Sequence, residues 1–282
     1  MRRFILTLSG PDRMGIVAAV AGFLLDHECN IVESGQFGDP ATLRFFMRVS
    51  FDTRRAATAQ ELHEAFAVVG DKFELQWAVH DTATKPRLLI MVSKFGHCLN
   101  DLLYRHRIGA LPVEIPAIVS NHRDFYKLAA QSDIPFHYLP VTPENKPKQE
   151  ERLLEIVQHE RCDLVVLARY MQILSPHVCA QLPGRAINIH HSFLPSFQGA
   201  KPYTQAHDRG VKLIGATAHY VTSELDEGPI IEQDVARVDH SMSAEDFAGV
   251  GRDVECAVLA RAVQWHVEHR ILLNGNRTVI FR

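Results

Sequence analysis

The chain has 282 residues, of which 46% are apolar, and its 30 Lys and Arg against 33 Asp and Glu give a net charge of −3. This length favours roughly two domains, each large enough to bury a core. The balanced charge excludes a protein that binds nucleic acid or an anionic membrane through charge alone. The longest apolar stretch, residues 15–25, is shorter than the roughly 20 residues that span a bilayer. No signal-peptide cleavage site follows the N-terminus, so we expect a cytoplasmic protein.

The cysteine and histidine patterns predict neither a disulfide nor a metal site. The five cysteines are scattered without a C-x-x-C pair, as expected of reduced thiols. The 16 histidines include no H-E-x-x-H sequence. His266 and His269 lie on a charged helix with no third ligand nearby in the sequence.

The first eighty residues predict a small domain. Alternating apolar residues indicate strands, and apolar residues three and four apart indicate helices. The order is βαββαβ, a ferredoxin-like unit, with elements at 3–8, 14–27, 30–37, 42–51, 59–70 and 73–79. Residues 80–86 are polar, lack periodicity and end in a proline, so we place the linker there and expect domains at 1–82 and 83–282.

The second domain shows repeated βα units, which predict a doubly wound, mostly parallel sheet in an α/β protein. Expected strands lie at 87–92, 116–119, 136–139 and 163–167, with helices at 99–105, 124–131 and 149–159. Further strands are expected at 186–189 and 213–221, and a long helix at 244–271, interrupted near Gly249 and Gly251. Ligands of such sheets bind beyond the carboxyl ends of the strands.

Two polar segments are expected near the carboxyl ends of strands, one around Asn188 and His190 and one around Asp226. Asn188 and His190 are two residues apart at a strand end, so both side chains project to one face. His191 is expected to face away. Asp226 lies in a turn-rich loop before Gly228-Pro229, which can bring a carboxylate over the pair.

The segment I-N-I-H-H-S-F-L-P at 187–195 is followed by Asp226 in D-E-G-P-I-I. This combination resembles the formyltetrahydrofolate-dependent formyltransferases over residues 87–282. The additional G-A-K-P-Y at 199–203, and a G-P-D-R-M-G-I-V segment at 10–17 that is typical of ACT domains, extend the resemblance to the whole chain. In this form it is similar to the formyltetrahydrofolate deformylase family.

The resemblance implies hydrolysis of 10-formyltetrahydrofolate to formate and tetrahydrofolate, which would supply formate and balance the one-carbon pool for purine synthesis. The folate is then the substrate, and no cofactor is expected. An amide such as that of Asn188 can stabilise the negative charge that develops on the formyl oxygen. Histidine titrates near neutral pH, which suits His190 for proton transfer. The resemblance implies that Asp226 favours the imidazolium and holds the attacking water.

Other site residues follow from the same resemblance. The loop after the strand at 163–167 is similar to the one that holds the folate pterin, and Leu225 and Gly228 are expected to contact the substrate as well. His219 and Lys201 are expected to lie behind the catalytic residues. The loop residues are Arg169, Tyr170, Met171, Gln172, Ile173 and Leu174.

Two alternatives remain open. One is formyl transfer to an amine acceptor such as glycinamide ribonucleotide, which family members bind through a glycine-rich loop after the first strand of this domain. Here that segment, 92–100, contains a single glycine, with Phe95 and His97 adding bulk, and hydrolysis is favoured. The other is an amino-acid sensor with a degenerate catalytic half, against which the retention of Asn188, His190 and Asp226 argues.

The first domain is expected to regulate the second and to form a homo-oligomer, a dimer or tetramer. Backbone amides near the start of its first helix suit the carboxylate of an amino-acid effector, with glycine and methionine as candidates. The residues expected to form this site are Gly10, Asp12, Arg13, Met14 and Gly15.

Overall fold

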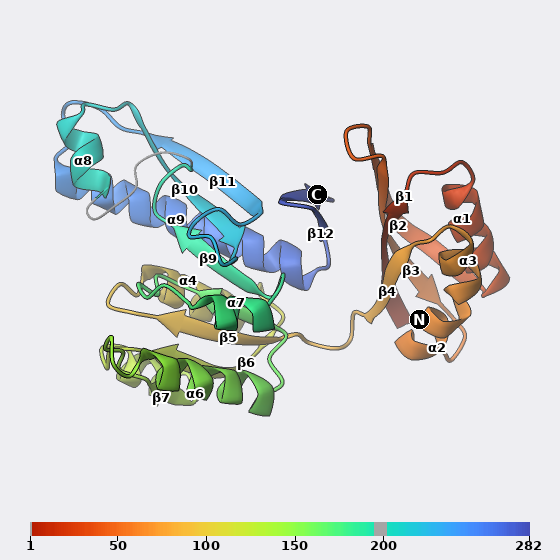
Figure 1. The fold of residues 1–282 in the computed structure, drawn as a ribbon, viewed down its shortest axis with the longest axis horizontal. Coiled ribbons are helices and arrows are strands. Elements are labelled where there is room, and N and C mark those ends of the chain that lie inside the picture. The colour runs from red at the N-terminus through yellow and green to blue at the C-terminus, as the bar shows by residue number, and fades with distance from the viewer. Residues whose placement is uncertain (1, 195–201) are drawn as a thin grey trace. The chain divides into compact units, whose positions relative to one another are not determined.

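The computed structural model describes residues 2–194 and 202–282, and the chain divides into two compact units (Figure 1). The first unit runs to Lys85 and also includes Glu268–Asn274 and Thr278–Arg282, while the second comprises Pro86–Val267 and Gly275–Arg277. The division therefore falls after Lys85, three residues beyond the expected position. The expectation that 83–282 form one domain also differs from the structure, because the C-terminal residues group with the first unit.

The first unit has the βαββαβ order that its sequence predicts, with the second helix divided in two. Its four strands form an antiparallel sheet in the order β2-β3-β1-β4, and the helices cover one face. Phe4, Leu6 and Leu8 alternate along β1 and point into the core between sheet and helices. The elements are β1 (Arg2–Pro11), α1 (Ile16–Asp26), β2 (Cys29–Asp39), β3 (Arg44–Thr53), α2 (Ala59–Ala65), α3 (Ala67–Lys72) and β4 (Gln76–Asp81).

The C-terminal hairpin, β12 (Ile271–Asn274) and β13 (Arg277–Ile280), is absent from the sequence-based prediction. The buried Arg48 of β3 donates hydrogen bonds to the backbone carbonyls of Glu268 and His269. Asn274 Nδ2 donates to Asp39 Oδ2 at 2.6 Å. These partners lie more than 200 residues apart in the sequence, so no local pattern could indicate them.

The second unit contains a seven-stranded sheet in the order β11-β10-β9-β8-β5-β6-β7. The five strands from β9 to β7 are parallel, and β10 runs antiparallel to both β9 and β11. The prediction of a mostly parallel sheet is thus confirmed. The strands are β5 (Arg87–Val92), β6 (Glu114–Ser120), β7 (Phe136–Tyr138), β8 (Leu164–Leu167), β9 (Ala186–His190), β10 (Leu213–Tyr220) and β11 (Ile230–Arg237).

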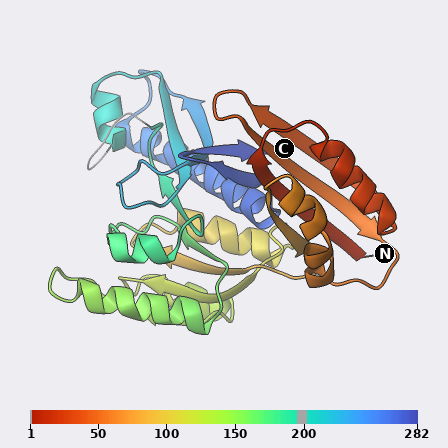
Figure 2. The ribbon, with the colours of Figure 1, turned by 45° about the vertical axis from the view of Figure 1, so that its right-hand side comes forward.

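Helices pack on both faces of this sheet (Figure 2). Alternate residues of β5 such as Leu89 and Met91 form a core with Val157 and Val178 of two helices on one face. The last helix contacts β9, β10 and β11. The helices are α4 (His97–Arg107), α5 (Tyr126–Gln131), α6 (Lys146–His159), α7 (Pro176–Gln181), α8 (Pro202–Asp208) and α9 (Ala244–Val267).

Helix α9 runs through Gly249 and Gly251 without a break, so the predicted interruption is wrong. A Cβ at Gly251 would lie 2.2 Å from Cζ of Tyr203, which shows that this glycine makes room for an aromatic ring. The helix ends at Val267 rather than at 271, and β12 begins at Ile271. Within the described part of the chain, no helix is both long enough and apolar enough to span a membrane.

The two glycines of α9 should respond oppositely to alanine. Gly249→Ala should stabilise the protein by about 0.5–1 kcal/mol, because glycine is entropically costly inside a helix and its added Cβ meets only Arg252 at 3.9 Å. Gly251→Ala should destabilise it by about 1–3 kcal/mol through overpacking against Tyr203. Denaturant titration of both variants checks this. Equal effects at the two positions would contradict the packing role of Gly251.

Candidate functional site

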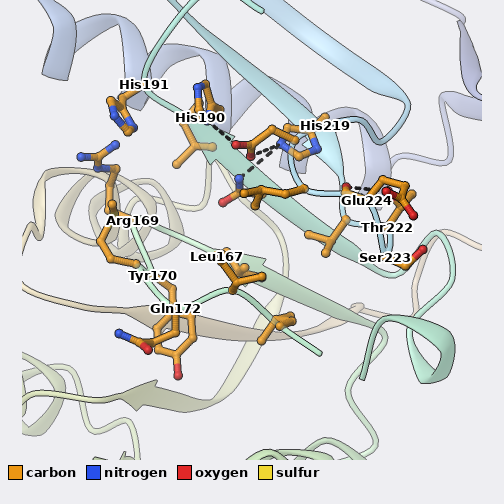
Figure 3. Close-up of a pocket in the computed structure, with 18 residues that line it drawn as sticks. Leu167, Arg169, Tyr170, Gln172, His190, His191, His219, Thr222, Ser223 and Glu224 are labelled. Atoms are coloured by element: carbon orange, nitrogen blue, oxygen red, sulfur yellow. Dashed lines mark hydrogen bonds and ion pairs between the residues drawn. The ribbon is translucent and has the colours of Figure 1, made fainter. Parts of the chain in front are cut away.

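A pocket with a cavity volume of about 200 Å³ lies where β8 and β9 end (Figure 3). Its walls come from the segment after β8, the end of β9 and the segment after β10. The lining residues are Leu167, Arg169, Tyr170, Met171, Gln172, Ile173, Leu174, Asn188, Ile189, His190, His191, His219, Val221, Thr222, Ser223, Glu224, Leu225 and Asp226.

Asn188 and His190 both line this pocket, as their alternation along β9 predicts. β10 lies beside β9 with His219 opposite Asn188 in the register. Three side chains from two neighbouring strands thus meet beside one cavity. They stand on sheet strands, which hold side chains more precisely than loops do.

Asp226 reaches this group from the loop between β10 and β11. Its Oδ2 lies 3.2 Å from Nδ1 of His190, and its Oδ1 lies 3.5 Å from Nε2 of His219. Burial raises the pKa of Asp226, whereas the hydrogen bond and charge interaction with His190 lower it, and the resulting pKa lies well below its ordinary value. Asp226 therefore stays ionised across the pH range in which histidines titrate.

His219 orients Asn188. Its Nδ1 lies 2.9 Å from the carbonyl oxygen of Tyr220 and donates to it, and in this tautomer Nε2 is the acceptor. That nitrogen lies 3.2 Å from Nδ2 of Asn188 and receives a hydrogen bond from it. Since an amide nitrogen carries two hydrogens, the second remains free to face the pocket.

The backbone of the 226–228 turn permits this approach. Asp226 has a φ of 57°, in the left-handed region that few residues other than glycine adopt. A Cβ at Gly228 would lie 1.7 Å from the carbonyl oxygen of Tyr220, so only glycine fits there. Gly228 is not among the residues that line the pocket, and its contact with substrate stays a prediction. Gly228 lets the Asp226 loop pack against the end of β10.

The loop after β8 is fixed to the end of β5 through Ser93. The amide of Ser93 donates to the carbonyl of Arg169, and the Ser93 hydroxyl accepts from the amide of Met171 at 2.9 Å. The hydroxyl then donates to Oδ1 of Asn121 at 2.7 Å. All six loop residues predicted to contact substrate, and Leu225 opposite them, line the pocket. The sequence did not indicate Ser93, because its contact with Met171 joins residues 78 positions apart.

His191 does not face away from the pocket as expected. It lines the pocket, and its ring stacks on that of His190 with centroids 5.0 Å apart. The strand ends at His190, so the alternation that predicted an outward direction does not extend to His191. Burial, with further contributions from the charges of Arg169 and His190, lowers the pKa of His191 to about 4. This side chain is therefore neutral at pH 7.

A buried carboxylate beside the pocket was missed by the sequence analysis. Glu255 of α9 is 1% exposed, and its carboxylate accepts hydrogen bonds from His97 Nε2 at 2.8 Å and from the Tyr203 hydroxyl. Arg169 Nε lies 3.3 Å from the same carboxylate. A sequence signal existed, because Glu255 shares a helical face with the buried Val258, Leu259 and Ala262.

His97, Cys98 and Glu255 have ligand atoms within 4.8 Å of one another, a grouping that the predicted absence of a metal did not anticipate. The carboxylate is already engaged by Arg169, whose positive charge opposes a metal cation. A hydrogen bond with Cys256 and burial raise the pKa of Cys98, which disfavours the thiolate that a metal needs. The arrangement fits a buried ion-pair network better than a metal centre.

The remaining predicted residues lie elsewhere. Lys201 is outside the described residues. Gly10 lies in β1, where an added Cβ would meet Leu75 at 2.8 Å. The other four proposed effector contacts form the exposed connection to α1: Asp12, Arg13, Met14 and Gly15, of which Gly15 is the N-cap with a φ of 96°.

The arrangement has the parts needed to hydrolyse or transfer an acyl group. His190 Nδ1 faces Asp226, while its Nε2 is buried without a hydrogen-bond partner among the described residues. A carboxylate that holds one ring nitrogen leaves the other available for proton transfer. Asn188 supplies an oriented amide donor for a developing oxyanion.

Both units match known families. Residues 2–80 match the ACT domain family, and residues 86–263 match the formyl transferase family. The formyltetrahydrofolate deformylase of Corynebacterium sp. is 50% identical over 99% of this chain and 98% of its own length. That of Bacillus subtilis is 47% identical over 98% of this chain and 93% of its own.

Solved structures agree with these matches. The formyltetrahydrofolate deformylase of Burkholderia mallei has a TM-score of 0.96 and 54% identity, and the similarity covers 100% of both chains. The glycinamide ribonucleotide transformylase 1 of Symbiobacterium toebii has a TM-score of 0.65 and 30% identity over 70% of this chain and 95% of its own. The resemblance found in the sequence is thereby confirmed.

The neutral His191 should make stability depend on pH. The unfolded chain binds a proton at this residue near pH 6.5, whereas the folded protein does so only near pH 4. Between these values the unfolded state holds more protons, so the free energy of unfolding falls as the pH falls. His191→Asn should reduce that slope by up to about 1.4 kcal/mol per pH unit, measured by denaturant titration across the window. An NMR titration that places His191 near pH 6.5 in the folded protein would contradict this.

Proposed function

The chain belongs to the formyltetrahydrofolate deformylase family, and we propose that its pocket hydrolyses 10-formyltetrahydrofolate to formate and tetrahydrofolate. The observation that carries the proposal is the convergence of Asn188, His190 and Asp226 on one pocket, with Nε2 of His190 unpaired among the described residues.

Asn188 polarises the formyl group. Its Nδ2 has one hydrogen on His219, and the second hydrogen donates to the formyl oxygen as negative charge develops there. Because His219 fixes the direction of the amide before substrate binds, little reorganisation is needed in the transition state. This role is supported by the distance of 3.2 Å between Asn188 Nδ2 and His219 Nε2.

His190 moves the protons. Its Nε2 takes a proton from the attacking water and then returns a proton to the departing folate nitrogen. The ionised Asp226, 3.2 Å from Nδ1, stabilises the imidazolium that forms between these steps. The C–O bond forms first, the C–N bond breaks when the folate nitrogen receives its proton, and formic acid then loses a proton to give formate.

The folate fits the apolar half of the pocket. The loop after β8 presents Met171 and Ile173, which are 52% and 58% exposed. Their apolar surfaces are therefore available to contact the folate. Tyr170 adds an aromatic wall and Gln172 an amide, and both line the cavity. Apolar walls with a few polar groups suit a flat heterocycle such as the pterin.

Hydrolysis is favoured over transfer because the segment after β5 is already filled. A Cβ at Gly96 would lie 2.2 Å from the ring of Phe125, and His97 is bonded to Glu255. The segment has no run of glycines that would expose amides to the phosphate of an acceptor. Water then serves as the nucleophile.

The purified protein should release formate from 10-formyltetrahydrofolate with no amine acceptor present. Asn188→Ala should lower kcat by about 10²–10³-fold and His190→Ala by about 10²–10⁴-fold, with unchanged melting temperatures. His159→Ala, at a side chain that is 85% exposed, is the control and should match the wild type. No formate release by the wild type would refute hydrolysis.

Asp226→Asn separates proton transfer from binding in the same assay. The variant keeps the size of the side chain but removes a charge that is present throughout the histidine range, so both kcat and the shape of the pH–rate profile should change. A change in KM alone, with the pH–rate profile unaltered, would show that Asp226 shapes the loop and takes no part in proton transfer.

The ACT-family unit is the proposed place of control. A hydrolase of this kind draws on the one-carbon pool that purine synthesis uses, so regulation by an amino acid would prevent its depletion. The exposed connection from Asp12 to Gly15 supports this, since α1 begins there without a side-chain cap and leaves backbone amides accessible.

Glycine or methionine should change the rate of formate release by the full-length chain. The full chain is required because residues after Val267 group with the first unit, and truncation would remove their packing. Asp12→Ala should weaken the response while leaving the effector-free rate unaltered, because Asp12 is exposed and outside the pocket. If no amino acid alters the rate or the melting temperature, the unit has no such sensing role.

A further inference from the structure

Arg169 carries a positive charge into the pocket without a full set of partners. It is 8% exposed and lines the cavity. Figure 3 shows its guanidinium beside His191. Its Nε and Nη1 are buried and lack hydrogen bonds among the described residues. A buried donor without an acceptor lowers the stability of the folded protein. The unpaired donors of this guanidinium therefore suit an anionic ligand.

The position of Arg169 is fixed. Its backbone has a φ of 65°, and its carbonyl accepts from the Ser93 amide at 3.2 Å. Its Nε lies 3.3 Å from Oε2 of Glu255, and its Cζ lies 5.6 Å from the centroid of the Phe95 ring. The backbone, an ion pair and an aromatic face thus hold the guanidinium from separate sides, and Nη1 remains unpaired.

The charges in the pocket show what this group would bind. Arg169 is the single Lys or Arg among the pocket residues that the structure describes. Asp226 is ionised, and Glu224 adds a further carboxylate at the rim. Hydrolysis of a neutral formamide with water yields an amine, a carboxylate and a proton. The new carboxylate is therefore repelled by Asp226 and attracted by Arg169.

We propose that the guanidinium of Arg169 forms a binding position for the formate product. This inference rests on the proposed function, since hydrolysis is what generates formate. Charge-assisted hydrogen bonds from arginine to a carboxylate are stronger than those between neutral groups. Formate leaves the reacting centre toward Arg169, while tetrahydrofolate occupies the apolar half of the pocket.

A competing interpretation is that Arg169 only neutralises the buried Glu255. The two interpretations differ in a measurable way. A purely structural cation predicts that its loss lowers stability without changing the response to formate. A formate position predicts weaker inhibition by formate whatever the effect on stability.

The test measures how sodium formate inhibits the hydrolysis of 10-formyltetrahydrofolate, with sodium chloride at equal ionic strength as reference. Arg169→Met should raise the inhibition constant for formate by about tenfold or more. Arg169→Lys should give a smaller increase, because it keeps the charge but loses the planar fork. Lys94→Met, which removes a neighbouring exposed charge outside the pocket, is the matched control and should leave the constant unaltered.

A second readout is independent of turnover. The NMR linewidth of ¹³C-formate should broaden with the folate-free wild type and with Lys94→Met, and much less with Arg169→Met. Broadening without hydrolytic activity would retain the anion position while refuting the proposed reaction. If Arg169→Met fails to fold, Arg169→Lys decides alone. Equal inhibition constants and equal linewidths in the wild type and the folded Arg169 variant would overturn the proposal.

Discussion

A half-buried negative charge held between two imidazoles organises the pocket. The two carboxylate oxygens of Asp226 lie against His190 and His219, and the contact with His190 helps to offset the cost of burying the charge. The same His219 fixes the amide of Asn188, so the orientation of one side chain depends on the next. The loop reaches the two histidines because Asp226 adopts a left-handed backbone conformation and Gly228 packs against the Tyr220 carbonyl.

Charge is distributed across the pocket in a way that suits the proposed reaction. The ionised Asp226 lies against His190, while His191 beside it stays neutral because burial and the charge of Arg169 lower its pKa. Arg169 is itself held by Glu255 of α9, a residue almost 30 positions beyond Asp226 in the sequence. The pocket therefore places an ionised carboxylate against His190 and a neutral histidine beside the Arg169 guanidinium.

The fold of the second unit is shared with formyl transferases. The Symbiobacterium toebii transformylase is similar over 70% of the chain, and the formyl transferase family match spans 86–263. The common fold supplies β9, β10 and the loops at their ends. Around this centre, the chain has the filled segment at Gly96, the network of Glu255 and an ACT-family unit that includes most of the C-terminal hairpin.

Local sequence patterns determined the alternation of Asn188 and His190, the two-unit organisation and the order of the elements in the first eighty residues, because these depend on side-chain periodicity and on turns. The motif around Asp226 identified the family for the same reason, since its residues are close in the chain. Tertiary structure alone decided the rest. His191 turns into the pocket because β9 ends before it, α9 passes Gly251 because Tyr203 packs there, and Arg48 captures the C-terminal segment. Each of these depends on a contact between residues distant in sequence or on where a strand stops, which no local period encodes.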